Sequence, residues 1–355
     1  MKKVKIGVIG CGYMAQMAHL PCLKSNDQAE VTVLCDFRKK VTEQLCRKLD
    51  IPQRTNSVEE MLKMDIDAVY VLTPVQWHLN NIESALKAGK HVFTEKPAAM
   101  CVESVKKLEA IAKINKQTLS VGYMKRNEAN LVELKNILAD NDYGDLLFIR
   151  NHSFIGKHWN AAINDLMSVV SSDEVPTFDL TPLDPGPTWL NATRDQDFYS
   201  FNNPYYALLD TGCHSINMLR YLTDKTPVLK ASKSVKGVRL AEFDFDGTAG
   251  TMEFCLNFKM HRWDEITELY FEKASVRILT PPPLDRQSSA IVEIYSEDGT
   301  LQRNIKLEDN RQWAFKLQTN NFIEKVLSGD NSSDLNDSEK DIEIIENIYK
   351  KGQVI

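Results

Sequence analysis

The first third of the chain alternates short apolar runs with segments of helical periodicity. Helices are expected at about Gly12–Lys24 and at Lys39–Leu49. Because the runs are apolar on both faces and alternate with helices, they predict a parallel sheet covered on both sides. Right-handed crossovers then give an α/β, Rossmann-like, doubly wound domain over residues 1–121. The expected strands are Val4–Ile9, Val31–Cys35, Ala68–Leu72, His91–Thr94 and Thr118–Val121.

The pattern changes after about residue 122. In Thr251–Lys259, Met252, Phe254, Leu256 and Phe258 alternate with polar residues, as in an antiparallel strand with one buried face. Residues 122–355 are therefore expected to form an α+β domain with a large, mainly antiparallel open sheet. Its other expected strands are Leu146–Ile155, Ile266–Phe271, Val276–Leu279, Ile291–Tyr295 and Leu301–Leu307, the last two joined by a turn at Asp298-Gly299, and its helices are Ala207–Leu222, Trp313–Leu327 and Ser338–Lys350.

Residues 156–206 are rich in Pro, Asp, Asn and aromatic residues and show no regular period. An irregular stretch of this length is usually functional or disordered, and its aromatic content argues against disorder. Two interpretations remain open. The segment is either a loop that walls a substrate pocket or a surface excursion packed by its own aromatics.

Composition narrows the class of protein. With 355 residues, two domains are the natural expectation, and the net charge of −6 gives no reason to expect nucleic acid or an anionic membrane as partner. The chain start runs directly into a strand, without the pattern of a secretory signal. The seven cysteines are scattered and form no C-x-x-C pair, which favours reduced thiols in a cytoplasmic protein over disulfides or zinc. No metal site is expected.

Residues Gly10-Cys11-Gly12-Tyr13-Met14-Ala15 fit the pattern G-x-G-x-x-[GA] between a strand and a helix. The first glycine permits a tight turn, and the second lets backbone approach a pyrophosphate at the helix N-terminus. Alone this pattern is weak.

Asp36 supplies a second element of the dinucleotide pattern. It ends the second strand, roughly 20 residues after Ala15, where a carboxylate recognises the ribose hydroxyls. This favours NAD, although the neighbouring Arg38 keeps NADP open. The alternative for Asp36 is a solvated turn carboxylate.

Three separated motifs resemble one family. The first is a block in which TPVQWH at 73–78 is followed by ALKAGKHVFTEKP at 85–97, the second is GYMKR at 122–126, and the third is DTGCH at 210–214. In this order they resemble the glucose–fructose oxidoreductase/inositol dehydrogenase family (Gfo/Idh/MocA). The resemblance spans the whole Rossmann-like domain. It implies a cis Lys96–Pro97 bond.

The resemblance implies a catalytic trio of Lys96, Asp210 and His214 around a substrate hydroxyl. The chemistry of the residues agrees with it, because an ammonium stabilises alkoxide character and a histidine accepts a proton near neutral pH. Asp210 and His214 are four residues apart and would share one helix face. The blander alternative makes Asp210 a helix N-cap and His214 a structural histidine.

The remaining candidate residues are assigned to cofactor or substrate. Trp77 would stack on cofactor or sugar, and Asn127 stands where many relatives carry an aromatic residue. The cofactor set is Gly10, Cys11, Gly12, Tyr13, Met14, Asp36, Arg38, Thr73, Pro74, His78, Glu95 and Lys96; the substrate set is Trp77, Tyr123, Lys125, Arg126, Trp159, Asp210 and His214.

The expected activity is that of an NAD(P)-dependent oxidoreductase. It would move a hydride between nicotinamide and a secondary alcohol or ketone of a sugar, cyclitol or nucleotide-linked sugar. The alternatives are an NAD-dependent glycoside hydrolase that uses transient oxidation and a non-catalytic sugar- or NAD-sensing protein. The resemblance also implies a homo-oligomer, dimer or tetramer, with the antiparallel sheet as interface.

Overall fold

The computed structural model describes residues 3–160, 168–174, 184–191, 197–297, 302–307 and 311–352. The chain forms two compact units. The first comprises Met1–Gly122 with parts of Met167–Ser200 and Gln318–Ile342, and the second comprises parts of Tyr123–Leu166, Phe201–Leu317 and Glu343–Ile355. The chain thus leaves the first unit next to the boundary expected at 121/122, but it returns to that unit twice.

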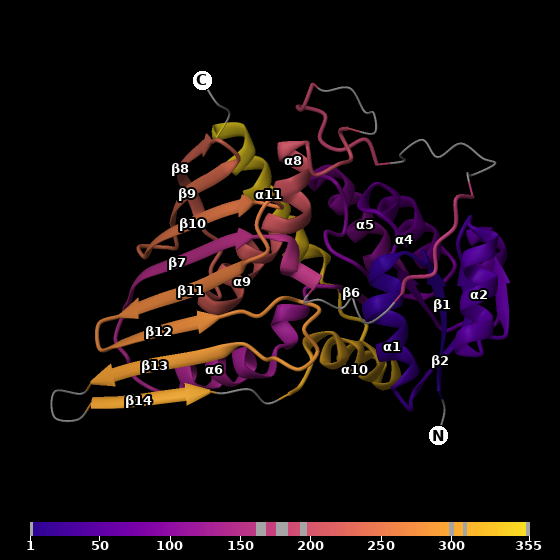
Figure 1. The fold of residues 1–355 in the computed structure, drawn as a ribbon, viewed down its shortest axis with the longest axis horizontal. Coiled ribbons are helices and arrows are strands. Elements are labelled where there is room, and N and C mark those ends of the chain that lie inside the picture. The colour runs from indigo at the N-terminus through magenta and orange to yellow at the C-terminus, as the bar shows by residue number, and fades with distance from the viewer. Residues whose placement is uncertain are drawn as a thin grey trace. The chain divides into compact units, whose positions relative to one another are not determined.

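The first unit contains a six-stranded, wholly parallel sheet in the order β3-β2-β1-β4-β5-β6. Figure 1 labels β1, β2 and β6 of this sheet. This is the doubly wound arrangement that the sequence predicts. Its short edge strand β3 was not predicted, because three residues carry no readable period. The strands are β1 (Val4–Ile9), β2 (Ala29–Cys35), β3 (Gln53–Thr55), β4 (Ala68–Val71), β5 (His91–Thr94) and β6 (Leu119–Val121).

The helix after the glycine turn is not one regular α-helix. Ala15–His19 forms a π-helical turn (η1), and α1 follows over Leu20–Lys24. Pro21 has no backbone N–H for the usual helical bond, which agrees with an irregular ladder at this point. The other helices of this region are α2 (Lys39–Leu49), α3 (Val58–Leu62), η2 (Val75–Trp77), α4 (His78–Lys87) and α5 (Val102–Asn115).

An aromatic cluster fills part of this unit's core. Tyr70 of β4 stacks on Phe93 of β5 with ring centroids 4.5 Å apart. Phe322 of α10 (Ala314–Ser328) meets both rings edge-on at 5.4 and 5.7 Å. A late segment of the chain therefore completes the core of the first unit.

The second unit contains an eight-stranded sheet in the order β14-β13-β12-β11-β7-β10-β9-β8. All neighbours are antiparallel except β7 and β10, which run parallel. The mainly antiparallel sheet is therefore confirmed. The strands are β7 (Leu146–Ile155), β8 (Val228–Val235), β9 (Val238–Asp244), β10 (Ala249–Leu256), β11 (Trp263–Phe271), β12 (Ala274–Leu279), β13 (Ile291–Glu297) and β14 (Gln302–Leu307).

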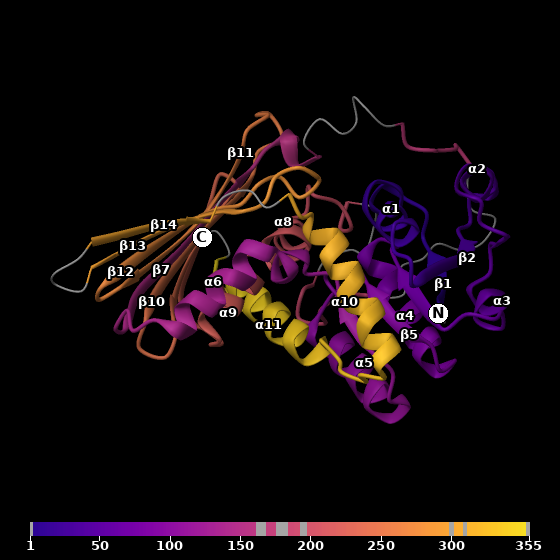
Figure 2. The ribbon, with the colours of Figure 1, turned by 90° about the horizontal axis from the view of Figure 1, so that it is seen from below.

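One face of this sheet is buried. Along β7, residues 149, 151, 153 and 155 are buried and alternate with partly exposed residues. Figure 2 shows α6 (Ala129–Asp140) and α9 (Cys213–Thr223) along one side of the sheet. The inward position expected for Phe258 is wrong, because β10 ends at Leu256 and Phe258 is 39% exposed. The expected turn at Asp298-Gly299 and residue Leu301 lie outside the described residues.

The remaining helical elements include short turns and the last helix of the chain. The helix expected at Ala207–Leu222 is divided into α8 (Pro204–Ala207), a π-helical turn η5 (Leu208–Gly212) and α9. Met124–Asn127 and Lys157–Asn160 form single 3-10 turns, η3 and η4, and α11 spans Leu335–Lys351.

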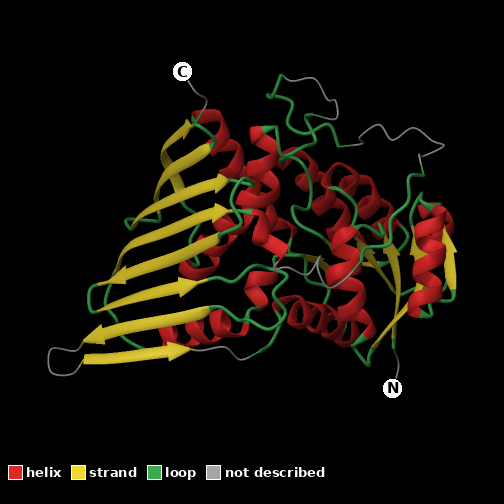
Figure 3. Cartoon of the chain, in the orientation of Figure 1, coloured by secondary structure: helices red, strands yellow, loops and turns green. Residues whose placement is uncertain are grey.

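The described residues at 168–174 and 184–191 are loops and turns, as Figure 3 shows. Some aromatic residues of the segment 156–206 pack on one another. The rings of Phe198 and Tyr199 are 4.9 Å apart, and those of Phe201 and Tyr206 are 5.6 Å apart. Self-packing is therefore present, while a role in walling a substrate pocket remains a prediction.

Candidate functional site

The two glycines of the first turn have different environments. Gly10 has φ of +91°, and a Cβ on it would lie 2.8 Å from the backbone carbon and oxygen of Leu72. Gly12 would place a Cβ in open space, with no atom within 4 Å. Gly10 therefore makes the turn, whereas Gly12 leaves backbone open to approach, as pyrophosphate binding at a helix N-terminus requires.

Asp36 is tied to the glycine turn. Its carboxylate accepts hydrogen bonds from the backbone N–H of Cys11 at 2.8 Å and from the backbone and guanidinium of Arg38 at 2.8–2.9 Å. Burial alone would raise the pKa of Asp36, but the bonds from Arg38 and Cys11 outweigh it and hold the pKa below its usual range. Asp36 is 8% exposed, so the alternative of a solvated turn carboxylate is wrong.

The loops after β4 and β5 are joined by His78. Its Nδ1 lies 2.8 Å from the carbonyl oxygen of Pro97, and its Nε2 lies 2.7 Å from that of Thr73. The ring is 1% exposed. His78 therefore positions the two loops through their backbones. This burial argues for a supporting role in the site in place of the direct cofactor contact expected from sequence.

Lys96 stands at the carboxyl end of β5 between two fixed neighbours. The carboxylate of Glu95 accepts hydrogen bonds from His19 Nε2 at 2.7 Å and from the backbone N–H of Lys96 at 3.1 Å. Burial alone would raise the pKa of Glu95, but His19 and Lys96 lower it further than burial raises it. The Lys96–Pro97 bond is cis, as the resemblance implied. Glu95 thus orients the backbone at Lys96.

Two predicted substrate residues meet in the second unit. The ring of Tyr123 lies edge-on to that of His214, with centroids 6.3 Å apart. Asp210 lies inside the π-helical turn η5, and the residue that caps α9 is Gly212. The reading of Asp210 as a helix N-cap is therefore wrong. π-Helical turns recur at functional sites.

Lys125 and Arg126 are both held by neighbours. The ammonium of Lys125 pairs with the carboxylate of Glu265, and both residues are buried. The Nε of Arg126 donates to Asn217 Oδ1 at 2.7 Å, and its guanidinium lies over the ring of Tyr221. These contacts give both residues a structural role in the second unit. Their expected substrate contacts remain a prediction.

The other predicted residues differ in exposure. Thr73, Trp77, Tyr13, Met14 and Trp159 are half-buried. Pro74 is exposed. Each is accessible enough to meet a ligand, and no observation in the structure assigns one to it.

Sequence reasoning missed two polar anchors of the first unit. The side-chain amide of Gln16 and the backbone of Val170 exchange two hydrogen bonds, of 2.8 and 2.9 Å. The carboxylate of Asp184, fully buried, accepts from the backbone N–H of Met100 and Gly186 and from the hydroxyl of Ser104. Gln16 and Val170 are 154 residues apart, and Asp184 lies 80 or more residues from Met100 and Ser104. No local sequence pattern therefore predicts these bonds.

The cysteines and acidic groups give no sign of other chemistry. All seven cysteines are free, and burial raises the pKa of Cys11, Cys35 and Cys101, which makes reactive thiolates unfavourable there. Cys213 is buried. Among the described residues there is no cluster of His, Cys, Asp and Glu suited to a metal ion, and no helix long and apolar enough to cross a membrane.

Comparison with known families decides the class of the first unit. Residues 4–123 match the Gfo/Idh/MocA family model, described as "Oxidoreductase family, NAD-binding Rossmann fold". This part of the chain is similar to the Gfo/Idh/MocA family. The match covers about a third of the chain. It includes Gly10, Asp36 and the motifs at 73–78 and 85–97, so the Gfo/Idh/MocA resemblance is confirmed over residues 4–123. The motif at 210–214 lies outside the match.

Curated relatives match over less than half of the chain. An inositol 2-dehydrogenase/D-chiro-inositol 3-dehydrogenase of Shouchella clausii is 33% identical over 156 residues, 41% of this chain and 43% of the relative. The uncharacterized oxidoreductase YdgJ of Escherichia coli is 28% identical over 152 residues, 42% of each chain. The matched region spans less than half the length of these relatives.

Solved structures resemble the whole chain in fold. The 3-ketoreductase KijD10 of Actinomadura kijaniata, in complex with NADP and TDP-benzene, has a TM-score of 0.73 at 19% identity, covering 99% of this chain and 98% of that one. The myo-inositol 2-dehydrogenase of Lactobacillus plantarum has a TM-score of 0.72 at 16% identity, covering 99% and 97%. At such identities the similarity shows that the fold is shared.

Proposed function

We propose that this protein is an NAD(P)-dependent oxidoreductase that acts on a secondary alcohol or ketone of a sugar, cyclitol or nucleotide-linked sugar. The observation that carries the proposal is the fixed position of Lys96. It follows a buried parallel strand inside the matched NAD-binding domain, between the bonded Glu95 and a cis proline. Ligands of open parallel sheets bind outside the carboxyl ends of the strands, which is where Lys96 stands.

The residues of the first turn fit a dinucleotide. Gly12 leaves backbone open, and Met14, which precedes the π-helical turn η1, makes no side-chain capping bond. Asp36 presents a carboxylate of lowered pKa at the end of β2. When bound there, a nicotinamide dinucleotide supplies hydride transfer.

We propose that Lys96, Asp210 and His214 serve one reaction. The ammonium of Lys96 would stabilise negative charge on the substrate oxygen as a proton leaves it. The imidazole of His214 would accept that proton, since a histidine works near its own pKa at neutral pH. Asp210, four residues earlier, would orient the imidazole.

The substrate class rests on the relatives. One relative is named as an inositol dehydrogenase, and inositol is a polyhydroxylated ring. One structural neighbour is named as a 3-ketoreductase and was solved with TDP-benzene, a nucleotide-linked molecule. The half-buried Trp77 and Trp159 would suit the apolar faces of such rings. Homo-oligomer formation through the sheet of the second unit, and a reducing cytoplasmic setting for the seven free cysteines, remain proposals as well.

The direct experiment is a substrate screen. The purified chain is mixed with sugars, inositols and sugar nucleotides, each with NAD⁺ and with NADP⁺, and the absorbance of the reduced nicotinamide is followed. We expect net reduction with at least one substrate. Nitrophenyl glycosides assayed without added cofactor form the contrasting arm, because turnover there without net reduction would indicate the glycoside hydrolase alternative. Binding of a dinucleotide with no turnover in either arm would favour a sensing role.

A further inference from the structure

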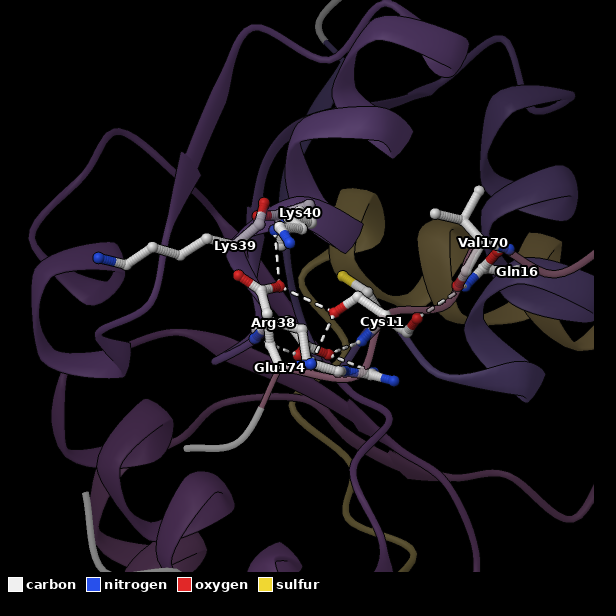
Figure 4. Close-up of polar contacts among 10 residues, drawn as sticks. Cys11, Gln16, Arg38, Lys39, Lys40, Val170 and Glu174 are labelled. Carbon is white, nitrogen blue, oxygen red and sulfur yellow. Dashed lines mark hydrogen bonds and ion pairs between the residues drawn. The ribbon is translucent and has the colours of Figure 1, made fainter. Parts of the chain in front are cut away.

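A seven-residue stretch from the aromatic-rich segment, residues 168–174, lies against the dinucleotide turn (Figure 4). At one end, Val170 and the side chain of Gln16 exchange two hydrogen bonds, while the same Gln16 amide donates to the carbonyl of Cys11 at 2.9 Å. At the other end, the carboxylate of Glu174 accepts from the backbone N–H of Lys40 at 2.8 Å. The stretch is therefore fixed at the first turns of two helices, η1 and α2.

These two anchor points flank Asp36. Gln16 belongs to the turn that follows Gly12, and Lys40 belongs to the turn that follows Asp36 and Arg38. In a Rossmann domain the ribose of the ADP half is read by the acidic residue at the end of the second strand. Glu174 therefore stands beside the position where NAD and NADP differ.

The charges at this position do not favour an additional anion. Arg38 makes two hydrogen bonds to the carboxylate of Asp36, so its guanidinium is already paired. The bond to Asp36 and, to a smaller degree, the negative charge of Glu174 raise the pKa of Arg38. The guanidinium is thus hydrogen-bonded to Asp36 and also feels the negative charge of Glu174. A ribose 2′-hydroxyl is neutral and tolerates both, whereas a 2′-phosphate would be repelled by both.

Glu174 itself is placed by local contacts. Its carboxylate also accepts from the hydroxyl of Ser172 at 2.9 Å, and its own backbone N–H donates back to that hydroxyl at 3.3 Å. The side chains of Lys39 and Lys40 are exposed at the start of α2. They would provide cationic groups for a phosphate if the charge of Glu174 were removed.

We propose that Glu174 is a specificity-determining residue that disfavours NADP and leaves NAD as the preferred cofactor. This inference rests on the proposed NAD(P)-dependent function. It assigns part of the selectivity to a residue outside the matched domain, 138 positions after Asp36. Asp36 selects the ribose hydroxyls, and Glu174 adds a second negative charge at the place of a 2′-phosphate.

The test is direct binding of NAD⁺ and NADP⁺, measured by titration calorimetry without any substrate. The variants are Glu174→Gln, which keeps the shape and removes the charge, and Asp173→Asn, which removes the same charge from the exposed neighbouring residue. We expect E174Q to tighten NADP⁺ binding about fivefold to tenfold and to change NAD⁺ binding less than about twofold. The gain should shrink at 0.5 M salt, since partly exposed charges are screened.

Three outcomes would overturn the inference. E174Q could leave the NADP⁺/NAD⁺ ratio unchanged, it could shift both affinities equally, or D173N could reproduce the gain, which would show a general charge effect. If the unmodified chain bound neither dinucleotide, the proposed function itself would be wrong, and this result is separate from the other three. Thermal unfolding of each variant confirms that the compared proteins are folded.

Discussion

His19 Nε2 donates a hydrogen bond to Glu95 Oε1 at 2.7 Å across the first unit. The two residues come from the helix after the glycine turn and from the end of β5. His19 is fully buried beside the stacked rings of Tyr70 and Phe93. This hydrogen bond therefore connects η1, the helical turn after the glycine turn, to the backbone next to Lys96.

Removing the charge of Glu95 should weaken the fold in a pH-dependent way. Its pKa in the folded chain lies below the ordinary value of 4.5, so its stabilising effect is present above pH 4.5 and is lost as pH falls through the folded pKa. We expect Glu95→Gln to lower the free energy of unfolding by about 1–3 kcal/mol at pH 7, measured with urea. The difference from the unmodified chain should narrow below pH 4.5.

Glu59→Gln is the matched control for that variant. Glu59 is exposed and pairs only with Lys63 among the described contacts, so its loss should change the free energy of unfolding little at pH 7. Equal changes in the free energy of unfolding for the two variants would show that the buried bond to His19 stabilises the fold no more than an exposed ion pair does.

The two glycines of the dinucleotide turn should respond oppositely to alanine. Gly10→Ala places a Cβ against the backbone of Leu72 at a positive φ. We therefore expect the free energy of unfolding to fall by about 1–3 kcal/mol. Gly12→Ala meets no atom within 4 Å and should change stability by less than about 0.5 kcal/mol. It should nevertheless weaken NAD⁺ binding, because the added methyl group covers the open backbone. Urea unfolding and calorimetry separate the two effects, and unimpaired NAD⁺ binding by G12A would contradict the assigned role of Gly12.

Asp184 should anchor its loop to the first unit. Asp184→Ala leaves the buried N–H groups of Met100 and Gly186 and the hydroxyl of Ser104 without this acceptor. We expect a loss of about 1–3 kcal/mol in the free energy of unfolding and faster hydrogen exchange at Met100. The exposed Asp197 offers the control variant Asp197→Ala. Unchanged exchange at Met100 in D184A would show that the anchor is not needed.

The buried pair of Lys125 and Glu265 should behave as a unit. Lys125→Met leaves the carboxylate of Glu265 buried without its cation, and we expect a loss of stability of about 3–5 kcal/mol. The double variant K125M/E265L removes both charges and should recover most of that loss. A K125M protein that keeps its stability but loses substrate affinity would instead favour the substrate contact expected from sequence.

Much of the fold could be predicted because its signals are local. Buried or alternating apolar residues mark three strands whose predicted bounds agree with the observed ones: Val4–Ile9, His91–Thr94 and Leu146–Ile155. Strands β8 and β9 were missed. In β8, lysine and serine occupy half of the eight positions and only Leu229 is buried, so no apolar period is visible.

The candidate site could be predicted only in part. The glycine turn, Asp36 and Lys96 lie in short motifs, and their chemistry can be inferred from spacing. The partners that fix them cannot, because His19 reaches Glu95 across 76 residues and Gln16 reaches Val170 across 154. His78 has the residue type of a ligand contact, and only its burial shows that both ring nitrogens face backbone carbonyls.

We propose that Lys96 stabilises the substrate oxygen during hydride transfer to a bound dinucleotide. The most direct measurement compares Lys96→Met with Lys87→Met, an exposed lysine of α4, for NAD⁺ affinity and for turnover of the substrate found in the screen. We predict that K96M binds NAD⁺ within about twofold of the unmodified chain and loses turnover about 100-fold or more, while K87M retains both. A K96M protein that turns over substrate at the unmodified rate would contradict the account.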